Sequence, residues 1–205
     1  MTLKAFAVLA LVSLTACGTS GKEYASDAAM AAPTAHYFAE GPRSVTLFTV
    51  VSVRNGSGAH SALLVNASEQ VLFDPAGSFS HPKVPERNDV LYGMNPRMVA
   101  FYIDYHARET YNVIEQTVSV SPQVAEMIKQ RVEANGAVGQ ARCANSISSI
   151  LTDIPGFEAV QTTFFPNKLS KEFAEQPGVQ RRFITDATAD HNHGVILVEP
   201  PKPNY

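Results

Sequence analysis

The sequence lacks most of the features that assign a protein to a class at first sight. Only two of its 205 residues are cysteines, which allows one disulfide at most, and the formal net charge of -3 shows no basic surplus. This charge balance is not the electrostatic footprint of a nucleic-acid-binding protein. Glycine-rich phosphate loops, serine nucleophile elbows and internal repeats of solenoid-like period are also absent.

Long apolar runs are absent as well, apart from one at the N-terminus. Lys4 is followed by an almost wholly apolar run, residues 5–16, which ends on small residues before Cys17. This is the layout of a secretory signal peptide. A run of about twelve residues is too short for a membrane span, which needs roughly 20. We therefore expect residues 1–16 to be a signal peptide.

The end of this run resembles a known export signal. Leu14-Thr15-Ala16-Cys17 resembles the bacterial lipobox, in which the cysteine is acylated and becomes the mature N-terminus. The resemblance implies a lipid on Cys17 and the membrane as a partner. Gly18 stands where an Asp would favour the inner membrane, which implies the periplasmic side of the outer membrane in a Gram-negative bacterium. The alternative is an ordinary signal peptide whose Cys17 stays free.

Hydrophobic residues make up 45% of the chain, which is enough for a sizeable core. We expect a tether over residues 17–43, a single domain over 44–199 and a Pro-rich tail over 200–205. Residue composition predicts strands in the first part of the domain. They are 45–53 (buried on both faces), 60–65 and 70–74 (joined by a hairpin at 66–69), and, after a long loop at 75–89, one or two within 101–120.

After residue 120 the pattern changes to a helical period. Ser121 and Pro122 predict the start of a helix that ends at Asn135-Gly136. Its apolar stripe is Val124, Met127, Ile128 and Val132. A second helix is expected over about 142–153, with a buried face of Ile147, Ile150, Leu151 and Ile154. The remaining expected elements are a strand at 157–165, a short helix at 169–176 and a last strand at 195–198. This order predicts an α+β fold with a mainly antiparallel sheet.

Cys143 is the candidate nucleophile. If Cys17 is acylated, Cys143 has no disulfide partner. It is expected at the N-terminal end of the second helix, where unpaired backbone N–H groups and the helix dipole stabilise a thiolate and can stabilise an oxyanion. No capping side chain immediately precedes it. The alternative interpretation is a small buried hydrophobic side chain.

His60 and Asp74 are the candidate partners of the thiol. His60 begins one strand of the predicted hairpin and Asp74 ends the next, so positions 60 and 74 or 75 are expected to lie opposite each other. Asp74 would then orient the imidazole of His60, the base that a nucleophilic thiol needs. A slip of one residue would put Asp74 on the other face. The alternatives are a turn histidine and an Asp-Pro turn.

The order His60, Asp74, Cys143 resembles that of circularly permuted papain-like (NlpC/P60-type) cysteine hydrolases over about residues 45–160. The resemblance implies Cys143 as nucleophile, His60 as base and Asp74 as orienting residue. It also implies cleavage or transfer of acyl groups at amide, ester or thioester bonds, with cell-envelope peptides (peptidoglycan stems) as substrates. Arg142 stands where the lecithin:retinol acyltransferase-like branch has Asn, which argues against lipid acyl transfer.

Other candidates are weaker. In Asp190-His191-Asn192-His193 the two histidines have the His-x-His spacing of zinc ligands, but a third ligand is not visible, so we favour a polar loop. We expect no metal or other cofactor. His106 is a substitute base, whereas His36 and His81 lie outside any catalytic context. Four basic residues predict a solvated face: Lys168, Lys171, Arg181 and Arg182. The alternative function is a non-catalytic, lipid-anchored binding module of the cell envelope.

Overall fold

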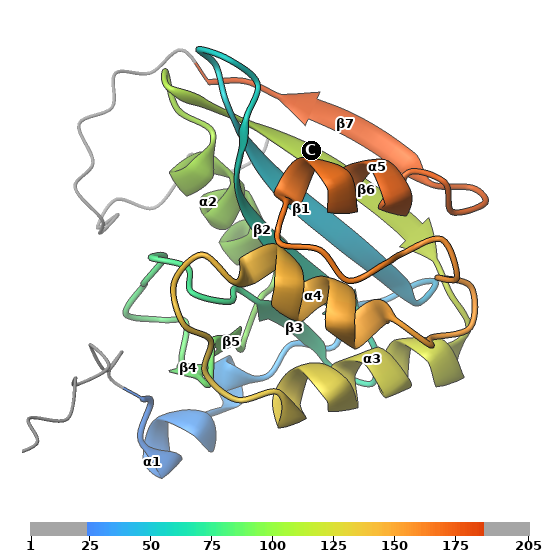
Figure 1. Cartoon of the computed structure of the whole chain (residues 1–205). Helices are drawn as coiled ribbons and strands as arrows, with labels where there is room; N and C mark the ends of the chain where they lie inside the picture. The colour runs from blue at the N-terminus through green and yellow to red at the C-terminus, as the bar shows by residue number, and fades with distance from the viewer. Residues whose placement is uncertain (1–23, 187–205) are drawn as a thin grey trace, which may run out of the picture.

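Seven strands form one sheet in the part of the chain that the computed structural model describes, residues 24–186. They are β1 (Ser44–Ser52), β2 (Gly58–Asn66), β3 (Gln70–Phe73), β4 (Glu86–Arg87), β5 (Val90–Leu91), β6 (Tyr111–Ser119) and β7 (Gln180–Ile184). The strands lie in the order β4-β5-β3-β2-β1-β6-β7, and every neighbouring pair is antiparallel (Figure 1). The expected α+β fold with a mainly antiparallel sheet is therefore confirmed.

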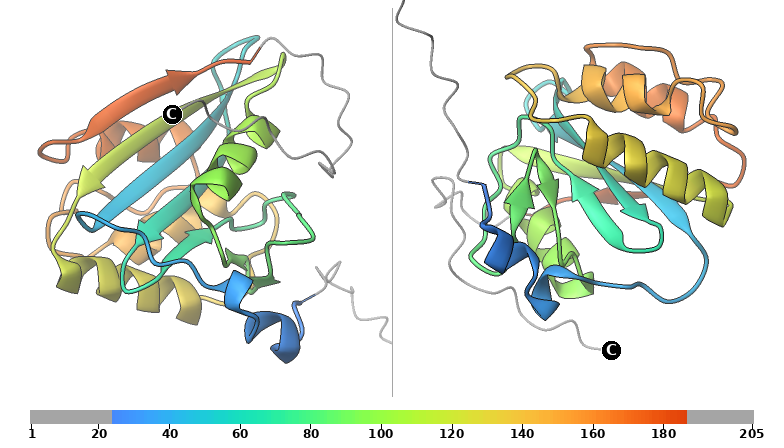
Figure 2. Two further views of the ribbon diagram at one scale, coloured as in Figure 1. Left: turned by 180° about the vertical axis from the view of Figure 1, so that it is seen from behind. Right: turned by 90° about the horizontal axis from the view of Figure 1, so that it is seen from below.

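Helices cover both faces of the sheet. They are α1 (Asp27–Met30), the 3-10 turn η1 (Pro33–Ala35), α2 (Pro96–His106), α3 (Pro122–Ala134), α4 (Cys143–Leu151) and α5 (Pro166–Phe173). Helices α3, α4 and α5 pack on one face, and α2 packs on the other, as the view from behind shows (Figure 2). Within residues 24–186, no helix has the length and apolar character that crossing a membrane requires.

Each face of the sheet has its own core because successive side chains of a strand point to opposite faces. Leu47 and Leu63 pack with the apolar residues of α3, α4 and α5. Phe48 and Ala62, one position away along the same strands, pack with the apolar residues of α2. Strand β1 is buried along nearly its whole length and pairs with β2 and β6, as its composition predicted.

The hairpin of β2 and β3 forms as expected, but in a different register. Leu63 pairs with Phe73 and Asn66 with Gln70. Continued along this register, Asp74 lies level with Ala62, so the expected pairing of position 60 with 74 or 75 was wrong. Asp74 lies opposite a position two residues along β2 from His60. An even displacement keeps both side chains on the same face of the sheet, here the α2 face.

The first two of the three helices predicted after residue 120 are confirmed as α3 and α4, and the third forms as α5, shifted toward the N-terminus. The Ser121 hydroxyl accepts from the Val124 N–H at the start of α3, and Pro122 occupies the first turn. Met127, however, is exposed, and Ala125 takes its place in the buried stripe. The buried face predicted for the second helix is confirmed: Ile147, Ile150 and Leu151 are buried in α4, and Ile154 is buried three residues after its end.

One strand, β6, forms within residues 101–120, where one or two were expected. The strand expected at 157–165 was wrong, and two elements, α2 and β7, were not expected. Residues 101–106 belong to helix α2, because Asn95 caps Pro96 and starts a helix there despite the aromatic and β-branched residues that favour a strand. Residues 157–165 contain no strand, since turns follow Asp153 and Gly156, both at positive φ. Strand β7 was not expected, because it is mostly exposed and lacks an apolar pattern. The predicted strand at 195–198 lies outside the described residues.

Residues 24–43, the described part of the predicted tether, contact the domain. Ala35 in η1 is fully buried, and the Tyr37 carbonyl accepts from the N–H of Gln70 at the start of β3. Gly93 has a positive φ, and a Cβ there would lie 2.3 Å from the Thr34 carbonyl oxygen. This close approach requires glycine. Residues 1–23 and 187–205, including Cys17 and the Pro-rich tail, lie outside the described residues.

Candidate functional site

The imidazole of His60 lies near the start of β2, where the ladder between β1 and β2 is irregular. Val50 pairs with His60 and Val51 with Gly58, so the pairing shifts by one residue at this point. Such bulges re-aim side chains next to functional sites. The Nε2 atom of His60 lies 2.7 Å from Oδ1 of Asp74. His60 and Asp74 are therefore joined, as the sequence predicted, although through a diagonal position.

Asp74 is fully buried directly after β3. Its Oδ1 accepts a second hydrogen bond, at 2.7 Å, from the hydroxyl of Tyr102 on α2. The carboxylate lies against Gly77, where a Cβ would be 1.8 Å from Oδ2. The Gly77 N–H also donates to the Asp74 carbonyl at 2.9 Å. A turn that closes on the carboxylate therefore fixes the orientation of Asp74.

Cys143 is the first residue of α4, whose N-cap, Arg142, makes no side-chain capping hydrogen bond. Strand β3 pairs with β2 only over Leu63–Asn66, which leaves the outer edge of the first part of β2 without a strand partner. Cys143 lies near this edge, where the imidazole of His60 and the backbone of Ser61 are close enough to lower the pKa of its thiol. Because Nε2 of His60 faces Asp74, Nδ1 is the nitrogen left for the thiol. The predicted trio is thus brought together.

The charges of the trio favour an ion pair. Burial alone would lower the pKa of His60, but the Asp74 carboxylate and the contact with Cys143 raise it to about 10. Burial alone would raise the pKa of Cys143, but the hydrogen bond and charge of His60 lower it, and so do backbone hydrogen bonds from Ser61 and Ala144. The site therefore favours a thiolate beside an imidazolium, the reactive form of a cysteine nucleophile.

Asp74 stays ionised despite its burial. Burial alone would raise the pKa of Asp74, but the charge and hydrogen bond of His60 hold it well below its ordinary range, helped by Tyr102. Burial and the Asp74 carboxylate raise the pKa of Tyr102 well above its ordinary value, so its hydroxyl remains a donor. Tyr102 was not predicted as part of the site, because helix α2 was not expected from the sequence.

His106 belongs to the same cluster but not to the thiol pair. Its ring stacks on that of His60 with centroids 5.6 Å apart, and its Nδ1–H donates to the Tyr102 carbonyl at 2.9 Å. Burial lowers the pKa of His106 to about 4, against the opposing effect of Asp74. His106 is therefore neutral at neutral pH, and His60 rather than His106 contacts Cys143.

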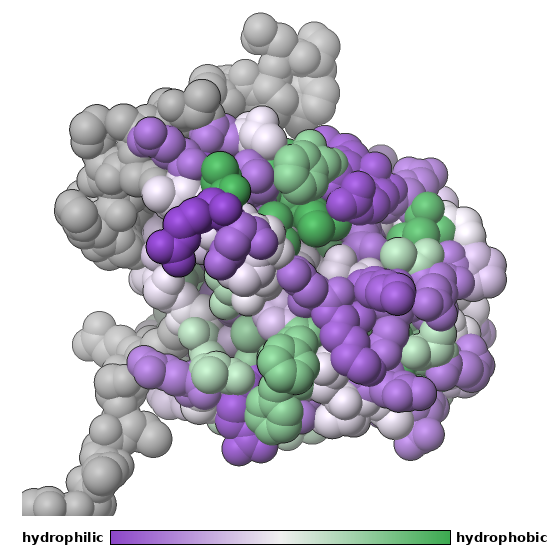
Figure 3. All heavy atoms as spheres, turned by 45° about the horizontal axis from the view of Figure 1, so that its top comes forward, coloured by the Kyte–Doolittle hydropathy of each residue, from purple (hydrophilic) through white to green (hydrophobic). Residues whose placement is uncertain are grey.

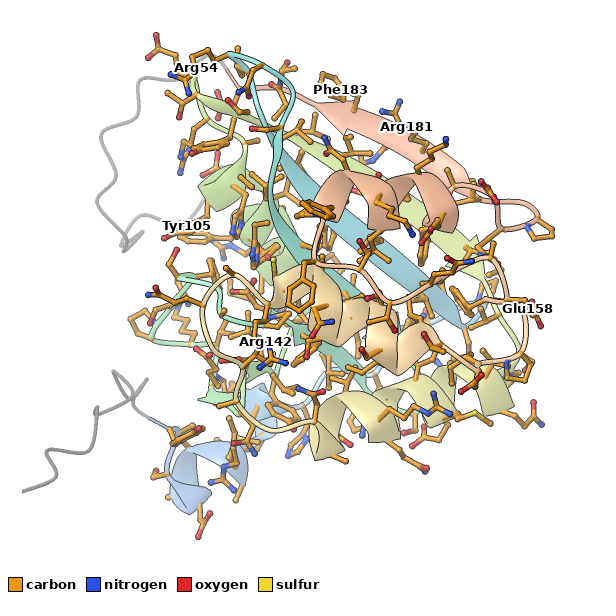
Figure 4. All side chains as sticks on the ribbon, viewed as in Figure 1. Arg54, Tyr105, Arg142, Glu158, Arg181 and Phe183 are labelled. Atoms are coloured by element: carbon orange, nitrogen blue, oxygen red, sulfur yellow. The ribbon has the colours of Figure 1, made fainter. Side chains whose placement is uncertain are left out.

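A cavity of about 420 Å³ opens beside the cluster. Its lining residues include His60, Gly77, Tyr105, His106 and Arg108. Cys143 is not among the lining residues, and only 7% of its surface is exposed. The cavity therefore reaches the imidazole directly, whereas the sulfur is nearly covered. Tyr105 lies at the end of α2 and Arg142 beside the first turn of α4 (Figure 4).

The remaining candidate residues lie elsewhere. His36 pairs with Glu69 at 2.8 Å, and the ring of His81 packs on Phe101. Two of the basic residues pair with acidic neighbours, Lys168 with Glu172 and Arg182 with Glu115. Arg181 and Phe183 extend together from β7 (Figure 4), with the guanidinium 6.0 Å from the ring centroid. His191 and His193 lie outside the described residues.

The surface around these basic residues is largely hydrophilic. The space-filling view shows hydrophobic residues as separate patches between hydrophilic ones (Figure 3). The large hydrophobic side chains that are more than half exposed include Phe164, Phe165 and Phe183.

Comparisons with protein-family models, with curated proteins and with solved structures found no match to this chain.

Proposed function

We propose that this protein is a lipid-anchored thiol hydrolase or acyltransferase with a permuted papain-like domain, acting on amide or ester bonds of cell-envelope peptides. The observation that carries the proposal is the chain of contacts from Asp74 through His60 to Cys143, at the uncapped start of α4. Nucleophile, base and orienting group in hydrogen-bond contact are what covalent acyl transfer needs.

The reaction begins with attack by the Cys143 thiolate on the substrate carbonyl carbon. N–H groups of the uncapped first turn of α4 stabilise the oxyanion that develops. The imidazolium of His60 then donates its Nδ1 proton to the leaving amine or alcohol, and a thioester forms on the sulfur. Neutral His60 next removes a proton from the second nucleophile, which is water in hydrolysis and a hydroxyl or amine in acyl transfer. This nucleophile attacks the thioester and releases the Cys143 thiolate.

Asp74 keeps the imidazole in the productive orientation throughout. Because its Oδ1 holds Nε2, the opposite nitrogen points at the sulfur in both protonation states of the ring. The Tyr102 hydroxyl and the turn at Gly77 hold the carboxylate in turn. Each of these groups touches Asp74, so they act as positioning residues rather than catalytic ones.

The proposed location rests on the N-terminal sequence. The lipobox-like Leu14-Thr15-Ala16-Cys17 supports anchoring through Cys17, and Gly18 supports the outer membrane. An exported enzyme anchored on the periplasmic side meets the peptide stems of the cell wall. This encounter, together with the family resemblance of the order His60, Asp74, Cys143, is the argument for the substrate class.

Trapping of the acyl-enzyme tests the proposed function. The wild-type protein is incubated with stem peptides and with activated acyl esters, quenched in acid, and digested for mass spectrometry. We expect the Cys143 peptide to gain the mass of the acyl group, and His60→Ala to slow this step strongly. Cys143→Ala is the blank. A wild-type protein that gains no acyl group from any of these donors would contradict hydrolase and transferase alike.

A second function is favoured by one observation. The cavity is lined by His60 but not by Cys143, whose sulfur is nearly covered. A lipid-anchored binding module would use this cavity without needing the thiol. Under this alternative, Cys143→Ala retains the cellular function and the binding of envelope peptides, whereas a substitution in the cavity lining, such as Arg108→Gln, removes both.

A further inference from the structure

We propose that His60, Asp74 and His106 form a binding site for a zinc-class divalent transition-metal ion, and that the bound ion blocks the thiol site. One ligand atom from each of the three residues lies within 4.8 Å of the others. Metal binding itself does not depend on the proposed function. Only the inhibitory effect rests on it.

The donor set suits zinc. Two imidazoles and one carboxylate, with a fourth position left to water, make a common zinc arrangement, and zinc lies about 2.0–2.2 Å from each such ligand. Ligand atoms around a tetrahedral ion are therefore about 3.3 Å apart. The 2.7 Å between His60 and Asp74 is already near this separation. To complete the triangle, His106 has to move closer by up to about 1.5 Å and turn its ring out of the stacked arrangement with His60.

His106 already has the outer hydrogen bond of a metal ligand. A ligating histidine usually donates its other ring N–H to a carbonyl or carboxylate, which fixes the tautomer. Nδ1 of His106 donates to the Tyr102 carbonyl at 2.9 Å, which leaves the Nε2 lone pair free for an ion. The hydroxyl of the same tyrosine holds Oδ1 of Asp74. Tyr102 therefore orients two of the three ligands.

The second oxygen of Asp74 points to an ion more directly. Asp74 is fully buried, and within residues 24–186 its Oδ2 has no hydrogen-bond partner. A buried acceptor without a partner is costly, by about 1–3 kcal/mol or more for a charged group. His60 and Tyr102 both hydrogen-bond Oδ1, so neither reduces the cost of burying Oδ2. A cation held by both oxygens of the carboxylate gives Oδ2 a partner and still lies beside Nε2 of His60, which is 2.7 Å from Oδ1.

An ion can reach the cluster from outside. The cavity of about 420 Å³ is lined by His60, His106 and Gly77, the residue against which Oδ2 lies. It provides both an entry path and room for the water molecule that fills the fourth position.

Binding of the ion changes what His60 can do. As the bond between Nε2 and the metal forms, the proton on Nε2 is released to solvent. The ring then keeps its Nδ1 proton, because losing it would create an imidazolate. His60 can neither accept a proton from water nor alternate between acid and base. The metal thus holds the site in an inactive form, reversibly.

Calorimetric titration of the purified full-length protein with Zn²⁺ tests the site. We expect one ion per chain, and His106→Gln should weaken binding by at least about tenfold, since even outer-shell losses cost 10–100-fold. Cys143→Ser, His36→Gln and His191→Gln/His193→Gln should bind as the wild type does, and Mg²⁺ should not bind. Binding by His106→Gln at wild-type strength, or its loss in Cys143→Ser, would overturn the proposal.

Two further measurements separate this proposal from the proposed function. X-ray absorption of the zinc-loaded protein should show nitrogen and oxygen ligands, and sulfur in the first shell would overturn the site even if His106→Gln folds poorly. Zn²⁺ should slow acylation of Cys143 at least tenfold in the wild type but not in His106→Gln. If acylation is absent without metal, the proposed function fails while the titration still decides the metal site.

Discussion

At the residue scale, the hydrogen bond between His60 and Asp74 sets the charges of the whole site. The carboxylate raises the pKa of His60 to about 10, and His60 in turn lowers the pKa of Cys143. Three titrating groups in contact behave as one coupled system. A change in Asp74 is therefore expected to reach the sulfur without touching it.

The substitution Asp74→Asn removes the negative charge that pairs with protonated His60. His60 has a raised pKa, so its contribution to stability is complete below its unfolded pKa of about 6.5 and is lost as the pH rises toward about 10. The lowered pKa of Asp74 contributes above its unfolded value of about 3.9 and is lost on acidification. We expect Asp74→Asn to reduce the free energy of unfolding by about 1–3 kcal/mol.

Denaturant unfolding at several pH values measures this difference. The reduction should be largest between about pH 4 and 6.5, where both partners are charged in the folded and unfolded states alike. It should shrink toward pH 10, because unfolded His60 is neutral above about 6.5 and folded His60 loses its proton near 10. A difference that stays constant from pH 5 to pH 10 would show that the pair does not set the pKa of His60.

Gly77→Ala tests the turn that closes on the carboxylate. The new Cβ would lie 1.8 Å from Oδ2 of Asp74, so the carboxylate or the turn must shift. We expect a lower melting temperature and a thiol that alkylates more slowly than the wild type. Gly139→Ala is the matched control, because a Cβ there meets nothing within 4 Å. Equal behaviour of the two variants would contradict the role assigned to Gly77.

At the element scale, the uncapped start of α4 adds to the effect of His60 on the Cys143 thiol. Arg142 makes no capping hydrogen bond, so the first N–H groups of the helix are left for the sulfur and for an oxyanion. Most helix starts are capped, and a serine in this position is usually stabilising. The chain thus forgoes some stability where the chemistry needs free donors.

Arg142→Ser should reverse that balance. A serine at the N-cap accepts from the N–H groups of the first turn, which stabilises the protein by about 0.5–2 kcal/mol. The same hydroxyl competes with the Cys143 sulfur for these donors, so acylation and alkylation should slow. Thermal melting and alkylation rates measure the two effects, with Arg54→Ser in an exposed turn as control. A variant that is both more stable and equally reactive would contradict the account of this helix end.

Local sequence signals predicted some elements well and missed others. Ser121-Pro122 and the apolar period predicted α3 and α4, and strand composition predicted the first three strands. Helix α2 was not predicted, because its aromatic and β-branched side chains favour a strand, whereas the cap formed by Asn95 and Pro96 decides the structure. This error concealed Tyr102 and the place of His106 beside Asp74. Tyr102 and His106 are four residues apart, a spacing that puts two side chains on one face of a helix. This spacing was the signal that could have placed both beside Asp74.

At the scale of the whole molecule, the site depends on contacts between distant segments. His60 and Asp74 are joined by a hairpin, which local patterns can predict, although its register was wrong. Cys143 comes from the opposite face of the sheet and reaches His60 only because β3 stops pairing at Leu63. The length of a neighbouring strand is set by tertiary packing, so this meeting could not be derived from sequence pattern alone.

The proposed anchor is separate in sequence from the described domain and is tested at this scale. Cys17→Ala should remove the lipid and release the protein from membranes into the periplasmic fraction. The site lies in residues 24–186, so the released protein should still acylate Cys143 at the wild-type rate. Fractionation and metabolic labelling with palmitate measure the first outcome. A Cys17→Ala protein that remains membrane-bound would contradict anchoring through this cysteine.

The central claim is that His60 and Asp74 hold Cys143 as a thiolate, and the pH dependence of its alkylation tests this most directly. Iodoacetamide labelling of Cys143, followed by mass spectrometry of its peptide, gives the rate at each pH for wild type and His60→Ala. We predict a wild-type midpoint well below the ordinary thiol value of about 8.5 and a midpoint raised toward or above that value in His60→Ala. Equal midpoints in the two proteins, near or above 8.5, would contradict the account.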